Sequence, residues 1–109
     1  MTNLLDARCR SQGVEPMSDG EIRNHLAQVS GWSVNDGAIE KTFTFKNYYE
    51  TIGFVNALAW ICNTEDHHPD LAVTYDRCVA RFSTHSVSGI TRNDFICAAK
   101  ADALVSFVA

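Results

Sequence analysis

The spacing of apolar side chains along this 109-residue chain switches between the helical period and the period of two that β-strands show. The pattern predicts, in order, a helix over residues 18–30, strands over 32–34 and 38–45, a helix over 47–65, strands over 71–75 and 78–82, and a helix from about residue 91 onward. The order is therefore helix, hairpin, helix, hairpin, helix. A four-stranded antiparallel sheet with three helices on one face, an α+β fold, is the simplest layered solution.

Local signals indicate where these elements begin and end. Ser18 and Glu21 have the form of a capping box, which starts a helix. The run Asn35-Asp36-Gly37 is typical of a short hairpin turn. Pro69 disfavours helical geometry in the residue before it, so residues 66–69 are predicted to form the turn that leads off the second long helix.

The apolar periods also predict which side chains are buried. The predicted stripe of the 47–65 helix consists of Ile52, Val55, Ala59 and Cys62, flanked by Phe54, Leu58 and Ile61. The predicted buried face of the last helix consists of Phe95, Ile96, Ala99, Ala103, Leu104 and Phe107. Tyr75 alternates with the apolar residues of its strand and is assigned to packing. Lys41 interrupts the apolar face of its strand, which marks a sheet edge or a point where that face reaches solvent.

The predicted domain spans residues 18–109, preceded by a flexible arm over residues 1–17 that has no sustained period. The formal net charge is −4 and the basic residues are scattered, so the chain lacks the basic stripe that nucleic acid requires. No secretory signal opens the sequence, and its most apolar stretch is about half as long as a bilayer-spanning helix. Three of the four cysteines lie in apolar periodic segments, which favours reduced thiols. The sequence predicts a cytoplasmic protein that binds a small molecule, with neither nucleic acid nor membrane as a partner.

Three of the four histidines, His67, His68 and His85, fall in predicted loops. Loops carry binding and catalytic residues more often than core elements do. The chain forms the second predicted hairpin between Pro69 and Thr84, which brings His85 back near His67 and His68. Imidazole has an unperturbed pKa of about 6.5 and exchanges a proton at neutral pH, so the three histidines are candidate acid–base residues.

Two other interpretations of the histidines stay open on chemistry alone. With Asp66 or Asp94 they are candidate zinc ligands. Adjacent residues of an extended chain point to opposite sides, however, which hinders His67 and His68 from sharing one metal ion. The remaining interpretation is a surface cluster without a function. Acid–base chemistry ranks first, because it needs reach to a small molecule and not convergence on one ion.

The histidines belong to a longer pattern. It consists of Glu65-Asp66-His67-His68-Pro69-Asp70, Tyr75, Ser83-Thr84-His85, Gly89-Ile90-Thr91 and Asp94, preceded by Gly31-Trp32 and the apolar strand face with Ile39, Phe43 and Phe45. Over about residues 18–107 this pattern resembles the pterin-4a-carbinolamine dehydratases, which are also known as dimerization cofactors of a homeodomain transcription factor. The fold that the resemblance implies agrees with the order of elements predicted above.

The resemblance implies a role for individual residues. They are the catalytic and substrate-binding His67, His68 and His85, the substrate-binding Asp66, Ser83, Thr84 and Ser86, and the supporting Pro69 and Asp94, of which Asp94 would support His85 or its loop. One position departs from the pattern. Where some members carry an acidic residue, this chain has Asn63, with Glu65 nearby, which leaves open whether a carboxylate besides Asp66 contacts the pterin.

The implied reaction is loss of water from 4a-hydroxytetrahydropterin to give quinonoid dihydropterin. The departing hydroxyl group needs a proton and the neighbouring ring nitrogen must lose one, so a paired acid and base suffice without a metal or other cofactor. The resemblance places this step in the recycling of tetrahydrobiopterin, with phenylalanine hydroxylase as a functional neighbour and a homodimer or homotetramer as the assembly. A protein-binding module, acting as a dimerization or assembly cofactor, is the second candidate, and a metal-dependent hydrolase is the third.

Overall fold

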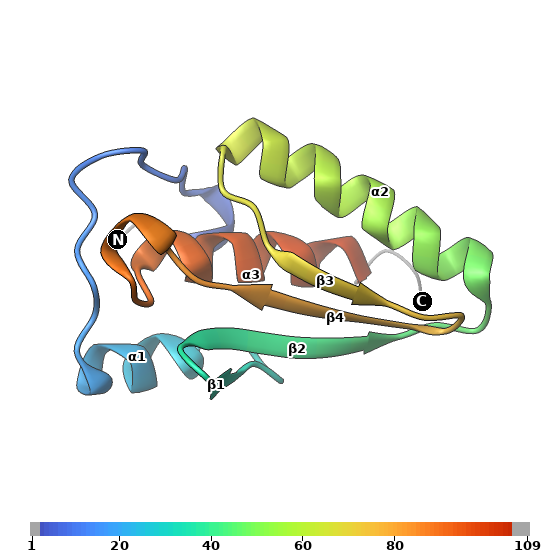
Figure 1. Cartoon of the computed structure of the whole chain (residues 1–109), viewed down its shortest axis with the longest axis horizontal. Helices are drawn as coiled ribbons and strands as arrows, with labels where there is room; N and C mark the ends of the chain where they lie inside the picture. Colours follow the sequence, from blue (N-terminus) through green and yellow to red (C-terminus); the bar gives the residue numbers. More distant parts are fainter. Residues whose placement is uncertain (1–2, 106–109) are drawn as a thin grey trace.

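The computed structural model describes residues 3–105 and contains the predicted order of elements (Figure 1). Its helices and strands are α1 (Asp19–Leu26), β1 (Ser33–Asn35), β2 (Ala38–Thr44), α2 (Tyr48–Glu65), β3 (Asp70–Val73), β4 (Arg77–Phe82) and α3 (Arg92–Val105). Two short 3-10 helices are η1 (Leu4–Asp6) and η2 (His85–Val87). The strands form one antiparallel sheet in the order β1-β2-β4-β3, which confirms the predicted α+β fold.

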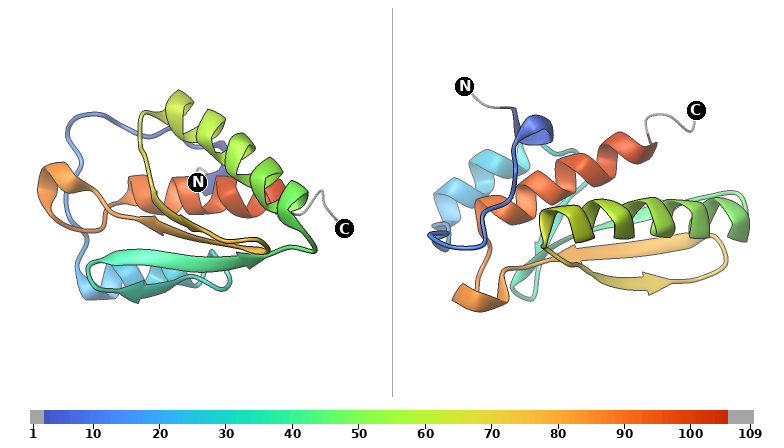
Figure 2. Two further views of the ribbon diagram at one scale, coloured as in Figure 1. Left: turned by 45° about the vertical axis from the view of Figure 1, so that its right-hand side comes forward. Right: turned by 90° about the horizontal axis from the view of Figure 1, so that it is seen from above.

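The helices lie on one side of the sheet, and the core fills the space between them and the two central strands (Figure 2). The buried side chains of these strands are Ala38, Ile39 and Phe43 on β2 and Cys78, Ala80 and Phe82 on β4. The ring of Phe43 packs on Phe54 of α2, with 4.6 Å between the ring centroids. The opposite face of β2 presents exposed threonines, as the period of two predicts.

The predicted turn signals are found at the expected places. Ser18 Oγ accepts a hydrogen bond from the Glu21 N–H, and the Glu21 carboxylate accepts one from the Ser18 N–H. Asp36 and Gly37 have φ values of 51° and 79°, the left-handed conformation that a two-residue turn between antiparallel strands requires. The helix that starts at the capping box is shorter than predicted, because it ends at Leu26 and the chain continues in turns.

Lys41 does not mark a sheet edge, because β2 pairs with β1 on one side and with β4 on the other. Its ammonium group donates hydrogen bonds to Asp102 of α3 and to the Ser30 carbonyl, both at 2.9 Å. The indole N–H of Trp32 donates to the same Asp102 carboxylate at 3.1 Å. The cation therefore occupies the helix-covered face of the sheet because a carboxylate of α3 lies opposite.

The buried face of α2 is rotated from the predicted stripe. Its buried residues are Thr51, Phe54, Leu58, Cys62 and Glu65. Ala59, which the sequence analysis placed in the stripe, is exposed, and the predicted flanking residues Phe54 and Leu58 form the centre of the contact. Over residues 3–105, none of the helices is both long enough and apolar enough to cross a membrane.

The assignment of Tyr75 to packing is wrong. The residue lies in the turn between β3 and β4, is 64% exposed, and stacks on the exposed ring of Tyr48 with 6.4 Å between the centroids. In α3, Phe95 and Ile96 are buried as predicted. Phe107 lies outside the described residues.

The described part of the arm, residues 3–17, packs against the helices, a contact that the sequence analysis did not predict. Leu4 and Ala7 are buried in the core. Lys100 of α3 donates a hydrogen bond to the Leu5 carbonyl at 2.8 Å. Further along, the Met17 N–H donates to the Ile90 carbonyl at 2.8 Å. The arm is thus held to the domain at both ends.

Three thiols meet where the arm contacts α2 and α3. Cys9 Sγ lies 3.6 Å from Cys97 Sγ, and Cys97 also interacts with Cys62. The hydrogen-bond contact between the two thiols raises the pKa of Cys97 and lowers that of Cys62. Burial raises the pKa of Cys78, which lies apart from the cluster on β4. All four cysteines are free thiols in the structure.

We expect one fast-reacting thiol, Cys9, in a titration of the folded protein with an aromatic disulfide reagent. Cys9 is half-buried on the arm, whereas Cys62, Cys78 and Cys97 are at most 1% exposed, and burial blocks attack on the reagent. The three buried thiols should react only after denaturation. Fast reaction of a thiol in a Cys9→Ser variant, located by peptide mass spectrometry, would contradict this expectation.

Candidate active site

The end of α2 fixes the direction of the segment that carries two of the histidines. Asp66 adopts a left-handed conformation, with φ of 53° and ψ of 43°. The His67 N–H donates to the Cys62 carbonyl at 3.1 Å and the Asp66 N–H to the Asn63 carbonyl at 3.2 Å, which satisfies the last carbonyl groups of the helix. Pro69 then keeps the chain extended into β3. His67 and His68 are therefore held at a helix end.

The hairpin of β3 and β4 brings the third histidine to the same place. Asp70, at the start of β3, pairs with Arg81, near the end of β4. The chain that enters the hairpin and the chain that leaves it are thus adjacent, as the sequence analysis predicts. Hydrogen bonds between Thr84 and Gly89 in both directions then close the loop that contains His85.

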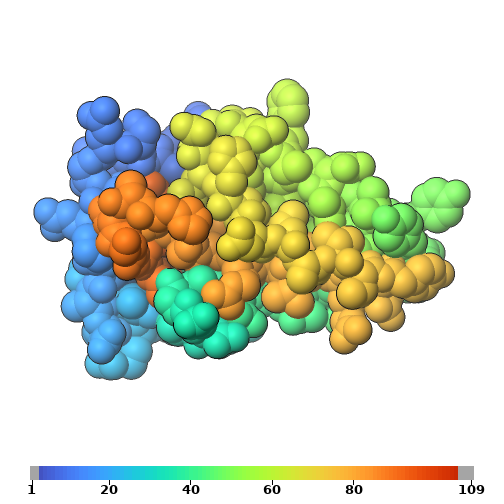
Figure 3. Space-filling view, viewed as in Figure 1, coloured from blue at the N-terminus to red at the C-terminus, as the bar shows by residue number. Residues whose placement is uncertain are grey.

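A pocket with a volume of about 260 Å³ opens where these segments meet. Its lining includes all seven residues predicted to contact a substrate: Asp66, His67, His68, Ser83, Thr84, His85 and Ser86. Figure 3 shows the arm, the segment after α2 and the loop after β4 side by side on one face of the molecule. Residues separated by almost twenty positions in sequence are gathered because the hairpin folds back on itself.

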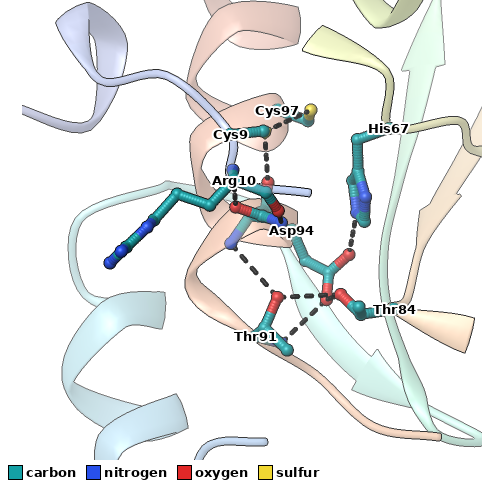
Figure 4. A network of polar contacts seen from close by, with 8 residues as sticks. Cys9, Arg10, His67, Thr84, Thr91, Asp94 and Cys97 are labelled. Carbon is teal, nitrogen blue, oxygen red and sulfur yellow. Dashed lines mark hydrogen bonds and ion pairs between the residues drawn. The ribbon is translucent and has the colours of Figure 1, made fainter. Parts of the chain in front are cut away.

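A buried carboxylate anchors one of the histidines (Figure 4). Asp94 Oδ1 lies 2.6 Å from His67 Nε2. Its other oxygen accepts hydrogen bonds from the Thr84 hydroxyl at 3.0 Å and from the Thr91 N–H at 2.9 Å. Asp94 is completely buried. Asp94 contacts the loop after β4 through Thr84, and its histidine partner is His67 and not His85.

This contact assigns the protons of His67. A carboxylate accepts hydrogen bonds, so Nε2 of His67 donates to Asp94, and in the neutral imidazole Nδ1 is the nitrogen left to accept a proton. The imidazole also stacks on Phe82, with 6.2 Å between the centroids and 11° between the planes. Its side chain is 11% exposed. The ring is held in one orientation with one basic nitrogen available.

The other two histidines are more exposed. His68 Nε2 lies 3.0 Å from the Asn63 side-chain oxygen, so the residue that replaces an acidic one in some relatives orients a histidine here. Glu65 does not replace that carboxylate, because it binds Cys9 and Arg8 of the arm and does not line the pocket. His85 begins η2 and is exposed at the pocket.

Four residues that complete the pocket wall are not predicted from the sequence. They are Arg10, Ser11 and Val14 of the arm and Asn93 of α3. The arm has no periodic pattern, and its contacts are made largely by backbone groups, which leave no mark in sequence. Asn93 could have been noticed because it neighbours Asp94 at the start of α3.

No three side chains of His, Cys, Asp or Glu converge as metal ligands would within the part of the chain that the structure describes. The direct contact between His67 and Asp94 takes up one ring nitrogen of that histidine. Together, the donors and acceptors of the pocket suit proton exchange with a polar molecule. Independence from metal stays a prediction.

Comparison with known proteins places the chain in a family. Residues 15–104 match the family model of pterin 4 alpha carbinolamine dehydratase. A relative from Stenotrophomonas maltophilia, named pterin-4-alpha-carbinolamine dehydratase, is 54% identical over 105 residues, which cover 93% of this chain and 90% of the relative. One of the same name from Chromobacterium violaceum is 50% identical, covering 94% and 95%.

A solved structure shows the same fold. The transcriptional coactivator/pterin dehydratase from Brucella melitensis has a TM-score of 0.80 and 30% sequence identity, and the match covers 83% of this chain and 98% of that one. The family match extends over the strands and helices that build the histidine pocket and over all the residues of the pattern. This chain belongs to the pterin 4 alpha carbinolamine dehydratase family.

Proposed function

We propose that this protein dehydrates pterin 4a-carbinolamine, 4a-hydroxytetrahydrobiopterin, to quinonoid dihydropterin. The observation that carries the proposal is the gathering of His67, His68 and His85 in one pocket, with a buried carboxylate behind His67. The names of its relatives support the same substrate class. No redox change occurs in this reaction, so acid–base residues are sufficient for it.

The reaction needs two proton transfers. The hydroxyl group on C4a leaves as water after gaining a proton, and the adjacent ring nitrogen loses its own proton as the new double bond forms. His67 suits the second role, because its free Nδ1 accepts a proton and the Asp94 carboxylate stabilises the resulting imidazolium. His85, exposed to solvent at the pocket, suits the first role, because it regains a proton from water after each turnover.

The third histidine has a positioning role in this proposal. His68 is oriented by Asn63 and lines the pocket beside Asp66, so both can hold the polar edge of the pterin ring. Ser83 and Ser86 add hydroxyl groups to the same lining. The reaction belongs to tetrahydrobiopterin recycling in the cytoplasm, with phenylalanine hydroxylase as the functional neighbour, no further cofactor, and a homodimer or homotetramer as the working assembly.

A second candidate function is a protein-binding module. The similar structure from Brucella melitensis is named both a transcriptional coactivator and a pterin dehydratase, so one fold is associated with both descriptions. If the protein is only a binding module, the histidine pocket does not catalyse the dehydration. We rank this candidate second, because a scaffold does not need three histidines around a pocket.

The deciding experiment is stopped-flow absorbance of freshly generated 4a-hydroxytetrahydropterin, with and without the protein. We expect its decay to accelerate in proportion to protein concentration, also after treatment with a metal chelator. A decay rate equal to that in buffer would remove the dehydratase proposal and favour the binding module. Activity that is lost with the chelator would instead favour the metal-dependent candidate.

A further inference from the structure

The arm contributes one wall of the histidine pocket. Arg10, Ser11 and Val14 line it together with the histidines, although they precede the family match, which begins at residue 15. Two buried polar side chains bind the residues of the arm next to this wall. The geometry of these contacts decides whether the arm is held in a defined position at the pocket.

Asn93 is the first of these two side chains. It is 4% exposed and lies in the first turn of α3. Its amide oxygen accepts a hydrogen bond from the Arg10 N–H at 3.0 Å, and its amide nitrogen donates to the Arg10 carbonyl at 2.8 Å. Both backbone polar groups of Arg10 are thus paired with a single side chain, which fixes the direction in which the chain continues to Ser11.

Glu65 is the second. Its side chain is 5% exposed, and its carboxylate accepts a hydrogen bond from the Cys9 N–H at 2.7 Å and forms ion pairs with Arg8 Nε at 2.8 Å and, more weakly, with Lys100 Nζ of α3 at 3.9 Å. The next residue in sequence is Asp66, which lines the pocket. Release of the arm would leave the buried Glu65 carboxylate and the buried Asn93 amide without their partners on the arm, which is costly in free energy.

The first turn of α3 therefore holds two sides of the pocket at once. Asn93 binds the arm, and the adjacent Asp94 binds His67 (Figure 4 shows Arg10 and His67 on either side of Asp94). A shift of the arm relative to this turn would move Ser11 relative to the histidines. The arm is in this sense part of the site.

We propose that Ser11 is a substrate-contacting residue, with its hydroxyl group bound to the polar edge or side chain of the pterin, and that Asn93 is the positioning residue that holds it there. This inference rests on the proposed dehydratase function. The arm contributes to binding and not to proton transfer, since the described arm residues of the pocket include no histidine or carboxylate.

The test compares steady-state constants of the dehydration reaction for wild type, Ser11→Ala, Asn93→Ala and the control Asn24→Ala, an exposed asparagine of α1. We expect KM to rise about threefold to tenfold for Ser11→Ala, the loss expected for one hydrogen bond. For Asn93→Ala we expect a rise of roughly tenfold or more, with kcat within about threefold of wild type, since the whole wall is released. Asn24→Ala should match wild type.

The thiols of Cys9 and Cys97 allow a rescue experiment on the KM of Asn93→Ala. A variant that had lost its structure in general would not be rescued. Diamide adds to the half-buried Cys9 thiol, and the Cys97 thiol, 3.6 Å away, then displaces the reduced reagent without meeting it in solution. The product is a disulfide that links the arm to α3. In Asn93→Ala this cross-link should return KM toward the wild-type value. The same treatment of an Asn93→Ala, Cys9→Ser double variant should leave KM high.

The outcomes separate this inference from the function on which it rests. If the wild type is active and KM is unchanged in both Ser11→Ala and Asn93→Ala, the arm proposal is overturned. The dehydratase proposal then remains intact. If the wild type has no dehydratase activity, both the arm proposal and the dehydratase proposal are removed. If Asn93→Ala fails to fold, Ser11→Ala decides alone, because the Ser11 side chain is exposed.

Discussion

Replacement of His67 by alanine is expected to lower kcat/KM for carbinolamine dehydration by about 10²-fold to 10⁴-fold, the usual contribution of a positioned acid or base. His67 has the defined proton arrangement described above, with Nε2 bound to Asp94 and Nδ1 available. Alanine removes the proton acceptor but leaves His68 and His85 in place. The measurement is the stopped-flow decay of the carbinolamine over a range of variant concentrations.

Two further variants show whether the loss comes from proton transfer. His67→Gln retains an N–H group that can donate to the Asp94 carboxylate but cannot titrate, and it should be as inactive as His67→Ala. His25→Ala removes a histidine that packs on Phe95 outside the histidine pocket, with 5.2 Å between the centroids, and it should retain wild-type activity. Near wild-type activity in His67→Gln would show that His67 is a structural residue.

The roles of the other histidines are tested in the same assay. His85→Ala should also lose kcat, because His85 is the proposed proton donor to the leaving hydroxyl group. His68→Ala should mainly raise KM, because its proposed role is to hold the ring. An unchanged kcat/KM in His85→Ala would overturn the assignment of the acid.

The fold could be predicted from the sequence because its signals are local. Two period-two segments around Asp36-Gly37 and a capping box at Ser18 determine the hairpin and the first helix through contacts within a few residues. The histidine pocket was predictable for a related reason. His67 and His85 flank a hairpin, and antiparallel pairing makes the ends of a hairpin neighbours.

What could not be predicted depends on contacts between distant segments. Lys41 interrupts an apolar face in sequence, and its partner Asp102 lies 61 residues away on α3. Asn93 binds backbone groups of Arg10, 83 residues earlier, and backbone groups are the same in every residue. The choice of His67 over His85 as the partner of Asp94 is likewise set by where α3 crosses the sheet, which periodicity does not specify.

Asp94→Asn is expected to lower kcat on the order of 10²-fold to 10³-fold while the protein remains folded. The carboxylate accepts hydrogen bonds on both oxygens, from His67 on one side and from Thr84 and Thr91 on the other. An amide has one oxygen and one NH₂ group. Because the Thr91 N–H is a fixed donor, the amide oxygen must face it and the NH₂ group must face His67.

That orientation reverses the protons of His67. Its Nε2 must now accept a hydrogen bond, so the ring proton moves to Nδ1, and the nitrogen proposed to take the substrate proton is blocked. The imidazolium also loses its negative partner. The loss of a charged acceptor at a buried position should destabilise the fold by about 1–3 kcal/mol, which is smaller than the stability of a typical domain of about 5–15 kcal/mol.

Asp102→Asn is the matched control for this variant. Asp102 lies on the same helix and accepts hydrogen bonds from Lys41 and Trp32, but it does not line the pocket. Both variants should show a lowered Tm in thermal unfolding, whereas only Asp94→Asn should lose kcat. If the two lost activity equally, the effect of Asp94 would be one of stability. A selective loss at Asp94 would show that the carboxylate acts through the proton arrangement of His67.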